Sequence, residues 1–154
     1  MKRNQLQLAI EKLSKKKPYK KHNIKFGEES LELYDAINNY LHLNQSYEEV
    51  KKEMMDVINT IEITLCSIDK NINEMVIDYK NESISDINLI ELGKNSYENS
   101  LLIYKYIGKN YDVKYIYKIQ EEMIKSYIAI NKLLTDKEKE EMLDFRIRQV
   151  EKHI

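Results

Sequence analysis

The sequence has few of the residues that interrupt helices or cross-link chains. Its 154 residues include three Gly, one Pro, one Cys and no Trp. Because β-sheets need many turns, and turns use Gly and Pro, this scarcity favours long helices with short connections. The one cysteine, Cys66, cannot form a disulfide within the chain and suits a reducing compartment. The predicted fold class is therefore all-α, and the cytoplasm is the expected location.

Long apolar runs and a strong charge of one sign are also absent. No stretch approaches the roughly 18 apolar residues that a membrane span requires, and the N-terminal segment does not resemble a signal peptide. The formal net charge is -1, so the overall charge favours neither nucleic acid nor membrane. No GxxxxGK[ST] pattern occurs, which excludes a P-loop. We expect neither a membrane nor a nucleic acid as partner.

Apolar periodicity divides the chain into helices. With 42% apolar and 33% charged residues, the chain suits one domain with one core. We expect residues 1–154 to form a single antiparallel helical bundle. Pro18 should end the first helix. The expected helices span about 3–15, 25–43, 47–69, 71–80, 86–107, 113–134 and 136–153.

Turn and cap residues set several of these boundaries. Ser46 with Glu49 predicts a capping box before the third helix, and Thr135 with Glu138 predicts one before the last. Gly93 predicts a break in the helix over 86–107. The short connection around Ser46 makes the second and third helices antiparallel neighbours.

Two acid pairs lie on or beside the apolar faces of these two helices. At about 100° of rotation per residue, Glu29 falls within the apolar stripe of the second helix and Glu53 within that of the third. Glu32 and Asp56 follow three residues later, at the edges of the same stripes. Since the two helices are neighbours, all four carboxylates are expected to lie together.

Four carboxylates in a partly dry site repel one another, and a divalent cation removes that cost. Oxygen ligands suit Mg²⁺, with Mn²⁺ as the alternative, whereas the absence of Cys and His disfavours zinc. Acid pairs at this spacing also cover solvated helix faces. Two inward pairs on adjoining helices favour the metal site. The predicted ligands are Glu29, Glu32, Glu53 and Asp56.

The pattern EExxE followed by ExxD resembles the MazG family of all-α nucleoside triphosphate pyrophosphohydrolases. Here it occurs as EESLE at residues 28–32 and EMMD at residues 53–56. The surrounding segments, KFGEESLELYDAI and EEVKKEMMDVI, are similar to two central helices of that family. YKNE at residues 79–82 resembles its Lys/Asn-containing segment. The resemblance covers about residues 5–82 and implies a four-helix core whose first half spans about residues 1–82.

The resemblance also implies an activity: Mg²⁺-dependent cleavage of a nucleoside triphosphate, ribo or deoxy, to a monophosphate and pyrophosphate. The four acids would then be catalytic metal ligands, and one would double as base for the attacking water. Lys25, Lys80 and Asn81 are candidate phosphate contacts. For these residues a lysine lying along an apolar face and a solvated loop are the simpler alternatives. The functional alternative is a catalytically inactive helical module that senses nucleotides or binds proteins.

The second half of the chain, about residues 84–134, repeats the spacing of the first. Glu98 and Glu122 are separated like the first acids of the two pairs (122 − 98 = 53 − 29 = 24), whereas Leu101 and Lys125 replace the second acids. This is either a degenerate internal duplication or a coincidence between two amphipathic hairpins. A duplication would resemble the dimeric dUTPase relatives of the superfamily. Lys125 would then be a candidate phosphate contact.

Two further expectations concern partners. A homo-oligomer is expected: a duplication allows a monomer or a dimer, and its absence requires a dimer or tetramer to complete the bundle. Five lysines lie between Lys15 and Lys21. A run this short is typical of a solvated linker, but it can also steer anionic substrates or bind nucleic acid.

Overall fold

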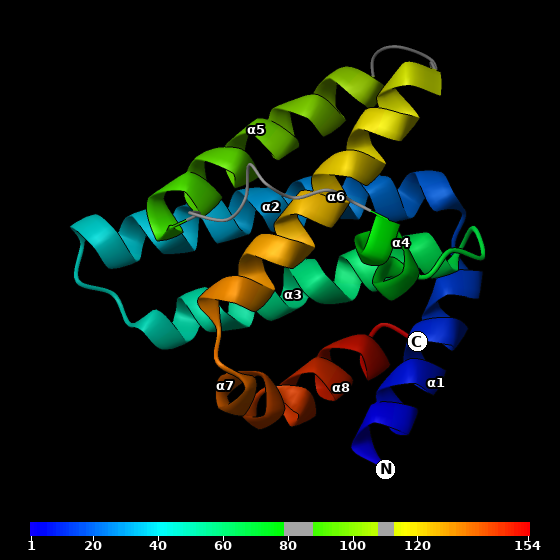
Figure 1. Ribbon diagram of the computed structural model, residues 1–154, viewed down its shortest axis with the longest axis horizontal. Coiled ribbons are helices and arrows are strands. Elements are labelled where there is room, and N and C mark those ends of the chain that lie inside the picture. Colours follow the sequence, from blue (N-terminus) through cyan, green and yellow to red (C-terminus); the bar gives the residue numbers. More distant parts are fainter. Residues whose placement is uncertain (79–87, 108–112) are drawn as a thin grey trace.

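The computed structural model describes residues 1–78, 88–107 and 113–154, and it confirms the all-α prediction. No strand occurs in these ranges. No helix within them is long and apolar enough to cross a membrane. The eight described helices form a bundle (Figure 1) and are α1 (Lys2–Lys16), α2 (Tyr19–His42), α3 (Tyr47–Cys66), α4 (Ile72–Asp78), α5 (Leu89–Ile107), α6 (Val113–Leu133), α7 (Asp136–Glu141) and α8 (Leu143–Glu151).

The boundary between α1 and α2 lies where Pro18 predicts it, but α2 begins six residues earlier than expected. Lys17 is extended, with φ −135° and ψ 154°, and ends α1. Pro18 then occupies the N-cap of α2, where its missing N–H costs nothing. The early start places Lys21 on the same helix as Lys25 and the first acid pair.

The two predicted capping boxes have different outcomes. Ser46 is the N-cap of α3, but its side chain makes no cap hydrogen bond; the Glu49 N–H instead donates to the Ser46 carbonyl at 3.3 Å. The capping box predicted there is therefore wrong. At α7 the box is confirmed, because the Glu138 N–H donates to the Thr135 hydroxyl and the Thr135 N–H donates to the Glu138 carboxylate.

The single helix predicted over 136–153 is wrong, because Met142 divides it into α7 and α8. Met142 has φ −89° and ψ −2° and packs into the main core. Its neighbour Leu143 belongs to a second core that also contains Ile147 and Val150. Two adjacent apolar residues thus enter different cores at the point where the helix is divided.

Gly93 does not break α5, contrary to prediction, and instead allows close packing against α2. A Cβ atom at Gly93 would lie 3.2 Å from Ile37 Cγ2, and one at Gly27 would lie 2.8 Å from Ile103 Cβ. Residue numbers rise along α2 as they fall along α5, so the two helices are antiparallel. A glycine from each therefore accommodates an isoleucine of the other.

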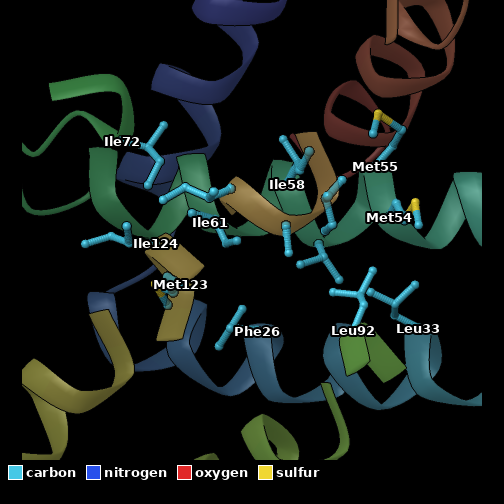
Figure 2. Packing of buried hydrophobic residues seen from close by; sticks show 14 of the residues in the cluster. Phe26, Leu33, Met54, Met55, Ile58, Ile61, Ile72, Leu92, Met123 and Ile124 are labelled. Atoms are coloured by element: carbon cyan, nitrogen blue, oxygen red, sulfur yellow. The ribbon is translucent and has the colours of Figure 1, made fainter. Parts of the chain in front are cut away.

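Two apolar clusters hold the bundle together, and α3 contributes to both. The main core is formed by α2, α3, α5 and α6, with Phe26, Leu33, Met54, Leu92 and Met123 among its residues (Figure 2). The second core joins α1, α8 and the outer side of α3. Helices α1 and α8 thus pack beside each other and beside α3 (Figure 1).

Candidate metal centre

Helices α2 and α3 bring the first acid of each pair toward the core. The side chain of Glu29 is only 8% exposed, because Phe26 and Leu33, one turn away on either side, are both fully buried. Glu53 is half-buried between Val50 and Val57, which are also buried. The apolar packing of both helices therefore fixes these two carboxylates at the interface.

Three of the four predicted ligands converge. Glu29, Glu53 and Asp56 each offer one carboxylate oxygen, and these oxygens all lie within 4.8 Å of one another. Glu32 is exposed at the rim of the group and is not part of it. The sequence pattern thus identifies the cluster, but it overstates how far Glu32 turns inward.

Burial and mutual repulsion favour the protonated form of all three acids. Burial, and then the charges of Asp56 and Glu32, raise the pKa of Glu53 to about 8. Burial is also the main reason that the pKa of Glu29 rises to about 7, although the ammonium of Lys25 opposes the shift. The pKa of Asp56 rises to about 6 through burial and the charge of Glu32. The lysines nearby therefore do not offset the burial and mutual repulsion of the three carboxylates.

Two buried carboxylate oxygens lack a hydrogen-bond partner among the described residues: Oε2 of Glu29 and Oε2 of Glu53. Buried polar atoms are normally paired, so each of these needs an explanation. The one ion pair at the cluster joins Lys25 Nζ to Glu29 Oε1 at 3.1 Å, which leaves both of these oxygens unpaired. Oxygen donors without hydrogen-bond partners fit a hard divalent cation such as Mg²⁺ or Mn²⁺.

A cleft of about 630 Å³ opens beside the cluster, within the range of roughly 300–1,000 Å³ that is usual for small-molecule sites. Helices α1, α2, α3 and α8 form its walls. Acidic, basic and amide side chains line it together with a few apolar ones. Its charged and imidazole-bearing lining residues are Lys17, Lys21, His22, Lys25, Glu28, Glu29, Glu32, Asp56, Lys152 and His153.

The remaining predicted residues are not part of this group. Lys125 lies on α6 and pairs with Glu121 at 3.2 Å and with Glu122 at 3.5 Å; it does not line the cleft. Lys80 and Asn81 lie outside the described residues. Of the two predicted phosphate contacts that the structure describes, Lys25 lies at the acid cluster and Lys125 does not.

The second hairpin, α5–α6, carries no corresponding acid cluster in its described residues. Glu98 is exposed, and Glu122 pairs with Lys118 at 3.1 Å. The buried polar pair is instead Asn99 and Ser126, whose side chains hydrogen-bond at 3.1 Å. Their separation equals that of Glu29 and Asp56 (126 − 99 = 56 − 29 = 27), so these neutral residues, not the aligned glutamates, join the two helices.

Sequence reasoning missed the part of the cleft formed by α8 and the residues after it, including Gln149, Lys152 and His153. No spacing signal connects this segment to the acid pairs. The lysine run around Pro18 was recognised, but its position beside the acids depends on the packing of α1 against α8.

Comparison of the chain with protein family models gave no match, and neither did comparison with curated proteins or with solved structures. The resemblance to MazG proteins therefore rests on the acid motifs and their surroundings.

Proposed function

We propose that the protein is a Mg²⁺-dependent nucleoside triphosphate pyrophosphohydrolase of the MazG type. The observation that carries the proposal is the convergence of three carboxylates, two of which have a buried oxygen without a partner, at the edge of a cleft that also contains lysines. Acids alone would be unfavourable there, and a metal-bound phosphate supplies both the cation and an anion for the lysines.

Each residue has a distinct task in this proposal. Glu29, Glu53 and Asp56 would hold the metal, with Mn²⁺ as a substitute for Mg²⁺. When bound, the metal neutralises charge on phosphate oxygens and lowers the pKa of a coordinated water. Glu32, exposed on the rim, is available as a further ligand or as the base that accepts the proton of the attacking water. Lys25 lies where it can contact a phosphate oxygen, and the products are a nucleoside monophosphate and pyrophosphate.

The test is a panel of ribo- and deoxynucleoside triphosphates with Mg²⁺, scored for pyrophosphate release. Glu53→Gln replaces one of the three carboxylates with a neutral amide. We expect kcat to fall at least about a hundredfold, because the weakened metal site stabilises less of the charge that develops on the phosphate. Glu49→Gln is the matched control, because Glu49 lies one turn earlier on α3 and is exposed. Absence of pyrophosphate release from every nucleotide would rule out the enzymatic proposal.

The second candidate is a protein that binds nucleotides through the same acids but does not hydrolyse them. The high pKa values of the cluster fit tight metal binding as well as they fit catalysis. Thermal stabilisation by a nucleotide with Mg²⁺, without product formation, would favour this candidate.

Self-association remains a prediction. Side chains on α5 that are large, apolar and exposed include Ile90, Tyr97, Leu101 and Tyr104, and they recur at helical spacing. Sedimentation of the wild type beside Leu101→Lys would test whether this stripe contacts a second copy.

A further inference from the structure

Three exposed lysines line the cleft. Lys17 precedes Pro18, Lys21 lies in the first turn of α2, and Lys152 follows α8, and all three are exposed lining residues of the cleft. Within residues 1–78, 88–107 and 113–154, no ion pair or side-chain hydrogen bond involves any of these three ammonium groups. By contrast Lys25, the fourth lysine of the cleft, is paired with Glu28 and Glu29.

Lys17, Lys21 and Lys152 line the same cleft, although they come from different parts of the chain. Burial lowers the pKa of His153, and the charges of Lys152, Lys25 and Lys17 lower it further. The charges of Lys152 and Lys25 also act on Asp56, where they oppose the upward shift of its pKa that burial causes. Lys152 therefore faces both the lysines near Pro18 and the acid cluster.

The cleft has a charge gradient along α2. Lys21 and Lys25 lie one turn apart, and Glu28, Glu29 and Glu32 follow in the next two turns on the side that lines the cleft. With a rise of 1.5 Å per residue, the backbone of Lys21 is about 12 Å from that of Glu29 along the helix axis. A ligand held at the acids can thus extend toward the lysines.

Packing of α1 against α8 holds Lys17 and Lys152 on the same side of the cleft. Leu13 and Val150 are buried in the core that joins the two helices. The ammonium of Lys16 donates hydrogen bonds to the backbone oxygens of His153, at 3.1 Å, and Ile154. At the other end of the pair, Lys2 forms an ion pair with Asp144 at 3.1 Å. The contacts between α1 and α8 therefore hold the backbone at Lys17 and Lys152 in place.

We propose that Lys17, Lys21 and Lys152 form a polyphosphate subsite that binds the terminal phosphates of the substrate while the acid cluster holds the metal. The inference rests on the proposed function for the identity of the substrate. It adds a specificity: a chain of three phosphates extends farther from the acids toward Lys17 and Lys21 than a monophosphate does, so the cleft should bind the longer chain more tightly. Lysine binds phosphate as a point charge, so affinity should also fall as salt rises.

The experiment measures binding of inorganic tripolyphosphate by calorimetry, at fixed free Mg²⁺, to three forms of the full chain. These are the wild type, the variant Lys17→Met/Lys21→Met/Lys152→Met, and the control Lys94→Met/Lys105→Met/Lys132→Met. The control removes the same charge from exposed lysines that do not line the cleft. We expect the first variant to lose at least about tenfold in affinity and the control to match the wild type, since short-range charge contacts exceed screened distant ones.

Kinetics with the preferred nucleotide give a second readout. The cleft variant should raise KM and leave kcat nearly unchanged, which is the pattern for binding energy shared by ground and transition states. Equal affinity of the wild type and the cleft variant for tripolyphosphate would overturn the subsite, even if pyrophosphate release is observed. Lysine-dependent binding of tripolyphosphate without hydrolysis of any nucleotide would support the subsite and overturn the proposed enzymatic function.

Discussion

The hairpins α2–α3 and α5–α6 both bury polar side chains between their helices, but the polar groups differ. Between α2 and α3, Glu29 and Asp56 lie with Glu53 in a cluster of raised pKa values. Between α5 and α6, the neutral pair Asn99 and Ser126 forms a hydrogen bond in a fully buried position. The first arrangement leaves buried oxygens unpaired, whereas the second pair is joined directly.

This difference separates stability from function. A buried hydrogen-bonded amide and hydroxyl contribute modestly to folding and need nothing further. Buried carboxylates cost free energy unless a cation is supplied. The first hairpin therefore has the properties of a ligand site, and the second has those of a structural contact.

The largest effect is expected when the acids between α2 and α3 are replaced by the neutral pair found between α5 and α6. Glu29→Asn combined with Asp56→Ser should abolish pyrophosphate release and weaken Mn²⁺ binding by at least about a hundredfold, because two of three ligands are lost. The metal-free variant should be more stable than the metal-free wild type by at least about 1 kcal/mol, since buried charge is removed. Calorimetric titration and thermal melts measure both effects. Glu98→Asn, at an exposed position of α5, is the control and should change neither.

The reverse exchange adds a charge to the second hairpin. Asn99→Asp places a carboxylate at a position that is 2% exposed, and we expect a loss of about 1–3 kcal/mol in the free energy of unfolding because that charge has only one hydroxyl partner. Urea unfolding at neutral pH measures the loss, and it should shrink at acidic pH. Unchanged stability at both pH values would show that α5 and α6 tolerate charge at their interface.

The smallest expected effect is a pH dependence that belongs to the first hairpin alone. The folded-state pKa values of Glu29 and Glu53, about 7 and about 8, lie above the usual value of 4.5. Between the usual value of 4.5 and these raised values, the folded state binds more protons than the unfolded state. The free energy of unfolding therefore falls as pH rises through this range. Melting temperatures of the metal-free protein should decrease from about pH 5.5 to about pH 8.5. Added Mn²⁺ should remove most of this decrease, and a slope that persists in Glu29→Gln/Glu53→Gln would assign it to other groups.

Periodicity predicted the helices and the main part of the cluster from sequence, because local packing decides both. Glu29 and Glu53 lie among apolar residues at helical spacing, so their burial follows from the pattern. Glu32 lies at the edge of the same stripe, and its exposure depends on how α2 is rotated against its neighbours. The split of the last helix at Met142 has the same origin, since it reflects which core each adjacent apolar residue enters.

The sequence did not predict that the lysines before and within α2 lie near Lys152 in one cleft, and the reason is different. Lys17 and Lys152 are 135 residues apart (152 − 17 = 135), and the contact between α1 and α8 has no sequence signature of its own. The resemblance to MazG proteins covers the acids and does not extend to this segment. Long-range packing therefore determines half of the candidate site.

The anchoring of Ile154 beside Lys16 has a practical consequence for handling the protein. A purification tag fused after Ile154 would emerge next to the cleft, which Lys152 and His153 line. A tag before Met1 would emerge at the opposite end of α1 (Figure 1). A polyhistidine tag after Ile154 would also place metal-chelating imidazoles near the carboxylates. A tag before Met1 is therefore the appropriate choice for metal titrations.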